Sequence, residues 1–375
     1  EGGAGTFSDG KLNTGNKRFE DHETVLRTFV ECGAPGEILY DAKPHIGTDR
    51  LREMIPNFRK RITALGGEFL FQSQFTGFRC DEKGRLSAVE INGTEWIHVS
   101  ALIPAIGHSA RDTYRMLLEK GVWLTPKAFA VGLRIEHEER MITLDRYGTL
   151  DYPGLGAAPY KLTYHAKDGR GVYSFCMCPG GFVVNASSEE GRTVVNGMSD
   201  YRRNAVNSNS AIVVQVAPSD YPGEPVLSGI RFQEILEERA YHAGNGRIPV
   251  QRFDDFLLNR KTVSFGSVFP SAKGGFTMGE VNSVFPEFIR NDIAESISYF
   301  GRIIRGFDNG DALLSAVESR TSSPVRIERD EKYESNIRGL FPAGEGAGYD
   351  GGILSSASDG IRTAEAVARS LGVLR

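Results

Sequence analysis

The chain has 375 residues, 40% of them hydrophobic and 25% charged, a composition typical of a globular protein with room for about two or three domains. Its 44 basic and 48 acidic residues are mixed along the sequence, which leaves no extended basic stripe for nucleic acid. We therefore expect no nucleic-acid partner. No apolar run approaches the roughly 20 residues that span a bilayer, so we expect no membrane insertion.

The cysteines and histidines do not form a metal or disulfide pattern. Four cysteines, only two of them close together, make neither a disulfide framework nor a paired CxxC site. The seven histidines lack HxxxH spacing. We therefore expect no metal site and a cytoplasmic location.

The chain opens on a glycine-rich loop, EGGAGTFSDGKL, without hydrophobic periodicity. Its amides and small hydroxyls are suited to wrap an electron-rich ring, and Lys11 is a candidate to stabilise negative charge there. The alternative is a flexible terminus. The candidate cofactor-binding residues of this loop are Gly3, Gly5, Thr6, Ser8, Asp9 and Lys11.

The next elements predict an α/β arrangement. Apolar residues at helical spacing predict a helix from Thr48 to Leu65, and a hairpin is expected to turn at residues 81–84. The apolar segment 101–106 reads as a buried strand that ends in a glycine loop, which is where open α/β sheets bind ligands. Any parallel strand-to-helix junction would look similar. The candidate cofactor-binding residues here are Gly107, His108, Ser109 and Asp112.

Residues 126–323 change to short β-rich runs and predict an inserted, mostly β domain. Within it, Asn207–Ala217 reads as a β-branched run, and helices are expected at Gly229–His242, Phe285–Phe300 and Asp311–Ser319. In an extended strand, Cys176 and Cys178 would share one face, which makes them candidate redox or catalytic residues alongside Lys11. The alternative is a pair of small core side chains.

The last segment, from Gly339 to Ala368, combines a short apolar strand, a run of glycines and an alanine-rich helix. Glycines at a strand end allow close backbone approach, and the amides at a helix N-terminus favour an anion or an electron-rich ring edge. A tight structural turn is the alternative. The candidate cofactor-binding residues are Gly344, Glu345, Gly346, Gly351, Gly352 and Ile353.

Together the blocks EGGAGTFSDGKL, IPAIGHSARDTY, SFCMCPGG, VVNGMSDYRRN and FPAGEGAGYDGGILSSASDGI resemble the uncharacterised bacterial NAD(P)/FAD-dependent dehydrogenases, relatives of the two-dinucleotide-binding flavoproteins. The resemblance implies an α/β, Rossmann-like FAD-binding domain of the glutathione-reductase type, interrupted by a β-rich insert. The family's first βαβ unit with its GxGxxG turn has no counterpart, which we interpret as N-terminal truncation. The expected division is 1–125 and 324–375 for the FAD-binding domain, with 126–323 as the insert.

The function that this resemblance implies is an FAD-dependent oxidoreductase that transfers a hydride between the flavin and a small-molecule substrate, with NAD(P)H as a candidate electron donor. Two alternatives stay open: a flavin-free scaffold or binding module, and a flavin-dependent RNA-modifying enzyme, which the acidic balance disfavours. We expect the β-rich segment to pack against the flavin side. A position remote from residues 344–353 would contradict that expectation.

Overall fold

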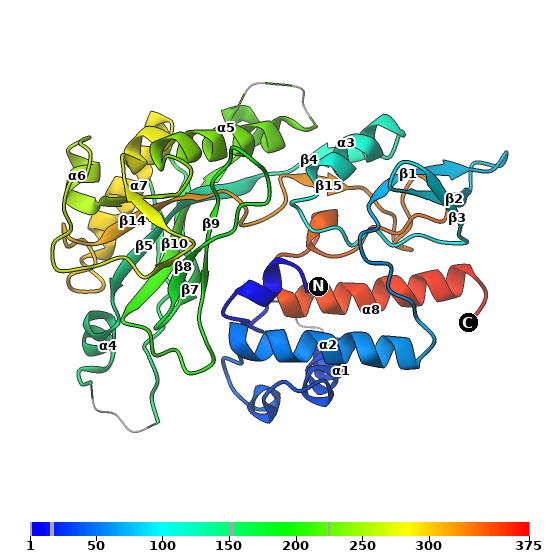
Figure 1. Ribbon diagram of the computed structural model, residues 1–375, viewed down its shortest axis with the longest axis horizontal. Coiled ribbons are helices and arrows are strands. Elements are labelled where there is room, and N and C mark those ends of the chain that lie inside the picture. Colours follow the sequence, from blue (N-terminus) through cyan, green and yellow to red (C-terminus); the bar gives the residue numbers. More distant parts are fainter. Residues whose placement is uncertain (1, 16–18, 151–153, 222, 224–225, 375) are drawn as a thin grey trace.

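The structure is a computed structural model that describes residues 2–15, 19–150, 154–221, 223 and 226–374. It is a mixed α/β protein in which one half is built on a large sheet and the other on packed helices (Figure 1). Glu1, at which the sequence starts, lies outside the described residues. No helix in the described part is long and apolar enough to cross a membrane.

The larger half contains a seven-stranded sheet in the order β13-β11-β14-β5-β10-β7-β6. The central strands β5 and β10 pair antiparallel along their whole length. The bounds are β5 Phe129–Glu138, β6 Thr163–His165, β7 Gly171–Cys178, β10 Asn207–Val216, β11 Ile248–Arg252, β13 Phe276–Met278 and β14 Leu313–Glu318.

The two faces of this sheet differ in polarity. One face, with residues such as Val131, Leu133 and Ile135, joins helices α5 (Ser228–Ala243) and α7 (Glu287–Phe300) in the main hydrophobic core. Because side chains alternate along a strand, Arg134 and Glu136 of β5 point to the opposite face, and both are buried. Helices α4 (Glu139–Tyr147) and α6 (Phe253–Leu257) and the small sheet of β12 (Ala272–Lys273), β8 (Phe182–Asn185) and β9 (Val195–Met198) complete this half.

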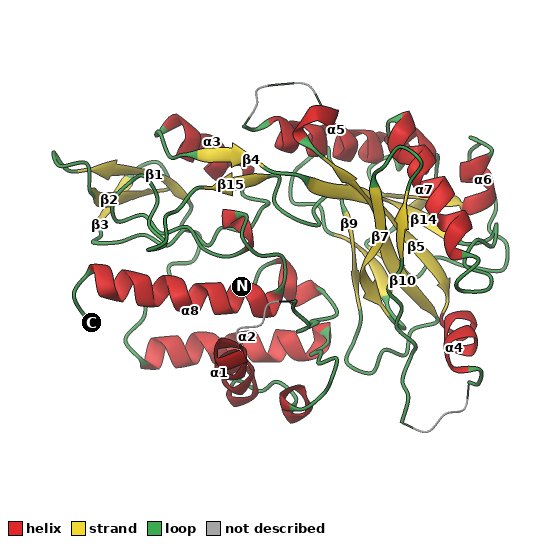
Figure 2. Ribbon diagram, turned by 180° about the vertical axis from the view of Figure 1, so that it is seen from behind, coloured by secondary structure: helices red, strands yellow, loops and turns green. Residues whose placement is uncertain are grey.

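The other half joins the two ends of the chain. Helices α1 (Phe19–Glu31), α2 (Thr48–Ala64) and α8 (Ile353–Ser370) share a hydrophobic core, and α2 and α8 lie side by side (Figures 1 and 2). A three-stranded sheet, β1 (Phe75–Cys80), β2 (Leu86–Ile91) and β3 (Glu95–His98), lies beyond them next to α3 (Arg111–Glu119). Strand β4 (Leu124–Pro126) pairs with β15 (Val325–Ile327), so the chain leaves and re-enters this half at adjacent strands.

Several sequence predictions are confirmed. The helix predicted at Thr48–Leu65 is α2, the hairpin at residues 81–84 joins β1 to β2, and the run at Asn207–Ala217 is strand β10. The predicted helices at Gly229–His242 and Phe285–Phe300 are α5 and α7 within two residues at each end.

Two predictions of secondary structure are wrong. Asp311–Ser319 is not a helix but contains strand β14, whose six residues are all buried. A short run that is buried on both faces has no period that separates helix from strand. The segment 101–106 is reduced to an isolated parallel bridge between Leu102 and Leu340. Pro104 lacks the amide hydrogen that would donate to the Phe341 carbonyl and extend this pairing into a ladder.

Candidate functional site

The glycine loops at residues 107–110 and 344–348 lie directly against each other. A Cβ built on Gly346 would lie only 2.7 Å from the backbone nitrogen of Gly107, so only glycine permits this approach. The buried hydroxyl of Tyr114 in α3 donates a hydrogen bond of 2.5 Å to the Gly346 carbonyl. The short helix η5 (Glu345–Ala347) completes this contact between the two loops.

The opening loop reaches the same region. It forms the short helix η1 (Ala4–Phe7), and the Thr48 hydroxyl at the start of α2 donates to the Thr6 carbonyl at 2.8 Å. A Cβ on Gly5 would lie 3.7 Å from Ile353, the first residue of α8. Ser8 is used within the loop, where its hydroxyl donates to the Gly5 carbonyl at 2.6 Å. The three predicted loops therefore meet, and we name residues 2–12, 107–110 and 344–353 together the loop junction.

Glycines at the loop junction leave room for close backbone approach. A Cβ built on Gly3, Gly107 or Gly351 would meet no atom of the described residues within 4 Å. Gly352 is the N-cap of α8 and has no side chain to cap the helix amides. A helix N-terminus of this kind attracts negative charge. Gly344 differs, because its amide donates to the Asp359 carboxylate at 2.8 Å.

Lys11 is a cation with spare hydrogen-bonding capacity. Its ammonium nitrogen is buried and has no hydrogen-bond partner among the described residues, and it lies 3.8 Å from Asp9 Oδ2. Asp9 is already engaged by Arg203, whose Nε and Nη2 donate to its two oxygens at 3.0 and 2.5 Å. Burial alone would raise the pKa of Asp9, but Lys11 and Arg203 hold it below its usual value. The pairing of Asp9 with Arg203 leaves the Lys11 ammonium available to a ligand.

Cys176 and Cys178 lie near this cation but not in the predicted arrangement. The β7–β10 pairing slips between Phe175 and Cys178, and Cys176 has a left-handed backbone with φ 46°, so the strand is not extended there. The premise that both thiols share one face is wrong at this bulge. The Cys178 thiol is buried and donates to the Cys176 carbonyl at 3.3 Å. Burial raises its pKa to about 11, against the opposing effects of Lys11 and Arg134.

Arg134 is a buried residue of this region that the sequence analysis did not single out. Its guanidinium donates to Glu318 at 2.8 Å, to the Cys176 carbonyl at 3.0 Å and to Asn209 at 2.8 Å. A single arginine in the apolar run AFAVGLRIE was the available signal, since a charge in a buried strand requires a partner. Arg134 connects the buried polar face of the large sheet to the cysteine bulge.

His108 and Glu345, both predicted site residues, contact each other. His108 Nδ1 lies 2.9 Å from Glu345 Oε1, and the histidine side chain is 9% exposed. The side chains of Ser109 and Asp112, two other candidates of this loop, form hydrogen bonds with residues outside the loop junction. Ser109 accepts a hydrogen bond of 2.9 Å from Arg320, and Asp112 accepts one of 2.7 Å from Gln74.

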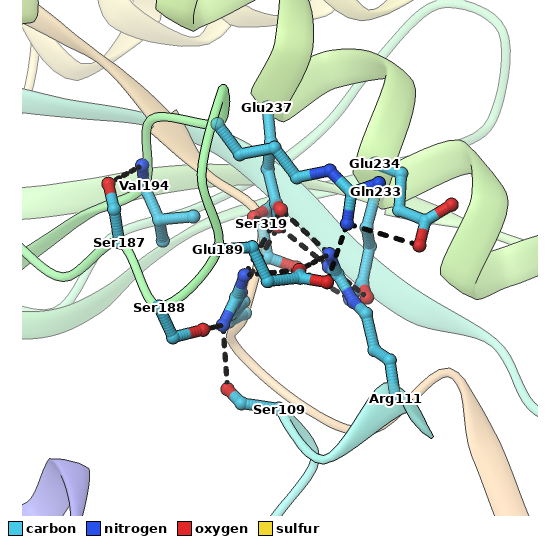
Figure 3. Close-up of polar contacts among 12 residues, drawn as sticks. Ser109, Arg111, Ser187, Ser188, Glu189, Val194, Gln233, Glu234, Glu237 and Ser319 are labelled. Carbon is cyan, nitrogen blue, oxygen red and sulfur yellow. Dashed lines mark hydrogen bonds and ion pairs between the residues drawn. The ribbon is translucent and has the colours of Figure 1, made fainter. Parts of the chain in front are cut away.

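A second polar cluster, which we name the ionic network, lies beside the loop junction (Figure 3). Arg111, at the start of α3, donates to Glu237 of α5 at 2.7 Å and to Glu189 at 2.5 Å. Arg320 donates to Glu237 at 3.1 Å, and the Ser319 hydroxyl donates to it at 2.6 Å. Burial would raise the pKa of Glu237, but hydrogen bonds from Arg111 and Arg320 lower it to about 2. The network ties α3 to the β-rich segment.

The β-rich segment is not remote from the loop junction. The amide of Thr48 donates to the Ser199 carbonyl at 2.9 Å, and the His45 ring stacks on Tyr201 at 5.3 Å. Together with the Asp9–Arg203 pair, these contacts place residues 199–203 against the opening loop. At the other end of this segment, Ser323 Oγ lies 3.3 Å from the Tyr114 hydroxyl that donates to the Gly346 carbonyl, so the segment is not remote from residues 344–353. Among the described residues, no group of three or more His, Cys, Asp or Glu could hold a metal ion.

Comparisons with known proteins point to flavin proteins. Residues 128–321 match the family model described as FAD-dependent protein, C-terminal domain-like. An uncharacterised protein of Clostridium beijerinckii is 46% identical over 372 residues, which cover 97% of this chain and 69% of that relative.

The similar solved structures include two enzymes at low similarity. A triple mutant of the flavin-dependent brominase Bmp2 is 11% identical, with TM-score 0.35, over 88% of this chain and 57% of that one. The FrdA chain of E. coli quinol fumarate reductase is 11% identical, with TM-score 0.35, over 97% of this chain and 61% of that one. The chain thus spans less than two thirds of these solved chains, and such TM-scores are too low to carry an argument.

Proposed function

Because the chain belongs to this family of FAD-dependent proteins, we propose that it is part of a flavin-dependent oxidoreductase that holds the flavin ring at the loop junction. The observation that carries the proposal is the buried Lys11 ammonium, which has no hydrogen-bond partner among the described residues and belongs to one of the loops with open glycines. Its ion pair with Asp9, at 3.8 Å, is too long for a hydrogen bond, so an electron-rich ligand would supply the acceptor that this buried ammonium lacks.

The residues present fit an FAD ring edge. Gly3, Gly107 and Gly351 would let the backbone approach the ring, and the uncapped amides at the start of α8 would face its electron-rich side. Lys11 would stabilise negative charge that develops on the ring. When bound, FAD supplies hydride transfer to or from the substrate.

The division of labour that we propose follows the chain. Segments 1–125 and 324–375 hold FAD, and 126–323 covers the loop junction, excludes water and selects a small-molecule substrate, with NAD(P)H as a candidate electron donor. The contacts of residues 199–203 with the opening loop support the covering role. Cys178 serves in packing in this proposal, because a thiol with a pKa of about 11 is protonated at neutral pH.

The test is binding of FAD to the purified protein, at its natural length and as this chain, followed by flavin absorbance. Gly351→Leu fills space that no described residue occupies, so it should leave the fold intact and weaken FAD binding by at least about tenfold. Gly156→Leu is the matched control, because Gly156 is also free of neighbours within 4 Å among the described residues.

A second variant tests the charge. Lys11→Met keeps the length of the side chain and removes the ammonium, which should weaken FAD binding by about tenfold, the value of one charged hydrogen bond. If neither the natural-length protein nor this chain binds FAD, or if both variants bind like the Gly156→Leu control, the loops are structural and the proposal fails.

A further inference from the structure

Three histidines of the described residues are buried, His22, His108 and His137, and His108 is the one that lies in the loop junction. His137 Nε2 lies 2.7 Å from the Phe307 carbonyl, whereas His137 Nδ1 and His22 Nε2 are buried without a hydrogen-bond partner among the described residues. His108 Nε2 is buried and has no hydrogen-bond partner among the described residues. A buried polar atom without a partner requires an explanation, and at a ligand-binding loop the explanation is a ligand or a proton-transfer role.

The other nitrogen of the ring lies beside a carboxylate. Nδ1 is 2.9 Å from Glu345 Oε1, a contact that becomes an ion pair when the ring is protonated but that does not have the geometry of a hydrogen bond. A lone pair on Nδ1 would repel the carboxylate oxygen at this distance. The neutral ring is therefore expected to carry its proton on Nδ1, which leaves Nε2 as the proton acceptor.

A second carboxylate faces this ring. Glu318 of β14 is buried, pairs with Arg134 at 2.8 Å and interacts electrostatically with His108. Burial raises the pKa of Glu318, and Arg134 opposes that effect. The charged groups that face His108 are thus Glu345 from the last loop and Glu318 from the β-rich segment.

We propose that His108 Nε2 takes up a proton when the flavin is reduced and releases it on reoxidation, and that Glu345 is the residue that positions the ring. The inference rests on the proposed function. When bound, the flavin would accept a hydride from the substrate or from NAD(P)H and would gain negative charge, and His108 Nε2 would accept one proton from water. The new negative charge at the loop junction stabilises the imidazolium, and reoxidation returns the proton.

The first experiment needs no flavin. Long-range ¹H–¹⁵N spectra of the histidine-labelled protein report which ring nitrogen is protonated, and the His108 signals are those lost in His108→Asn. We expect the Nδ1–H form in the wild type and in Glu345→Asp, and a mixture of both forms in Glu345→Ala. His165→Asn, at an exposed position in β6, should remove only its own signals. An Nε2–H form in the wild type would overturn the proposal.

The second experiment uses the FAD-loaded protein at its natural length, titrated with dithionite in the presence of redox dyes. One additional proton per two electrons changes the equilibrium tenfold per pH unit, which is about 30 mV. The midpoint potential of the wild type should therefore fall about 30 mV per pH unit more steeply than that of His108→Asn near neutral pH, where imidazole changes charge.

The outcomes separate the two proposals. Equal slopes in wild type and His108→Asn, with normal FAD binding, overturn the role of His108 and leave the proposed function standing. Absence of FAD binding, with the Nδ1–H form present, refutes the proposed function and with it the coupling of the proton to flavin reduction. If His108→Asn fails to fold, the same test compares the pH dependence of the midpoint potential in Glu345→Ala with that in Glu345→Asp.

Discussion

We predict that Glu237, at the centre of the ionic network, contributes strongly to the stability of the fold. Its carboxylate is fully buried and accepts hydrogen bonds from Arg111 at 2.7 and 2.8 Å, from Arg320 at 3.1 Å, and from the hydroxyl of Ser319 at 2.6 Å. Glu237→Gln keeps the shape of the side chain and removes the charge. The guanidinium groups of Arg111 and Arg320 then share a site with less negative charge. A buried cation without a full ionic partner lowers the free energy of unfolding.

The expected loss can be worked from the pKa. A carboxyl pKa lowered from 4.5 to about 2 corresponds to roughly 3 kcal/mol of stability at neutral pH. Loss of one member of a buried ion pair costs about 3–5 kcal/mol in general, which agrees. Because the folded pKa lies below the unfolded one, this contribution is complete above about pH 4.5 and is lost as the pH falls toward 2.

The assay is urea unfolding at pH 7 of Glu237→Gln beside Glu238→Gln. Glu238 is the neighbouring residue on α5, its side chain is 39% exposed, and its ion pairs with Arg192 and Arg231 are 3.5 and 3.3 Å long. The Glu238 variant should lose less than about 1 kcal/mol. Equal stability of the two variants would refute the reasoning that the network holds α3 to the β-rich segment.

Three further predictions follow from local contacts. Burial raises the pKa of Glu136 to about 7, so the free energy of unfolding should fall as the pH rises from about 4.5 to 7. Glu136→Gln removes this titration, so its free energy of unfolding relative to wild type should improve by roughly 3 kcal/mol over that range, as measured by urea unfolding at several pH values. Gly180→Ala should cost about 2–4 kcal/mol in thermal unfolding, because φ is 46° and a Cβ would lie 1.9 Å from the Arg203 carbonyl oxygen; a similar cost for Gly169→Ala, which has φ 91° and open space among the described residues, would contradict this. Iodoacetamide at neutral pH should label the exposed Cys80 at least about tenfold faster than the buried Cys178, and mass spectrometry of the peptides reads the result.

The sequence predicts the helices and the glycine loops well for a physical reason. The helices α2, α5 and α7 carry apolar residues at helical spacing, so their burial can be read from the chain. Gly346 is required because a Cβ there would lie 2.7 Å from the Gly107 backbone nitrogen, whereas Gly107 has a left-handed backbone with φ 64°. A glycine in such a loop thus indicates close backbone contact even when the contacting segment is far away in the sequence.

Two features could not be predicted because they depend on pairing across the fold. The left-handed backbone at Cys176 arises from the register slip between β7 and β10, which no local pattern shows. The partners of Arg111 and Arg134 come from segments more than 40 residues away in sequence, such as Glu189, Glu237 and Glu318. A sequence shows that a buried charge needs a partner but does not show which residue supplies it.

The start of α3 connects the two polar regions of this structure. Gly107 and His108 belong to the loop junction, whereas Arg111, three residues after His108, is 2% exposed and belongs to the ionic network. A shift of α3 that strains the Arg111–Glu237 pair therefore also shifts the Gly107 backbone relative to Gly346, where the space is too small for even a Cβ. The network thus contributes to the position of the ligand-facing loop. Through α3 it also contributes to the position of His108 relative to Glu345.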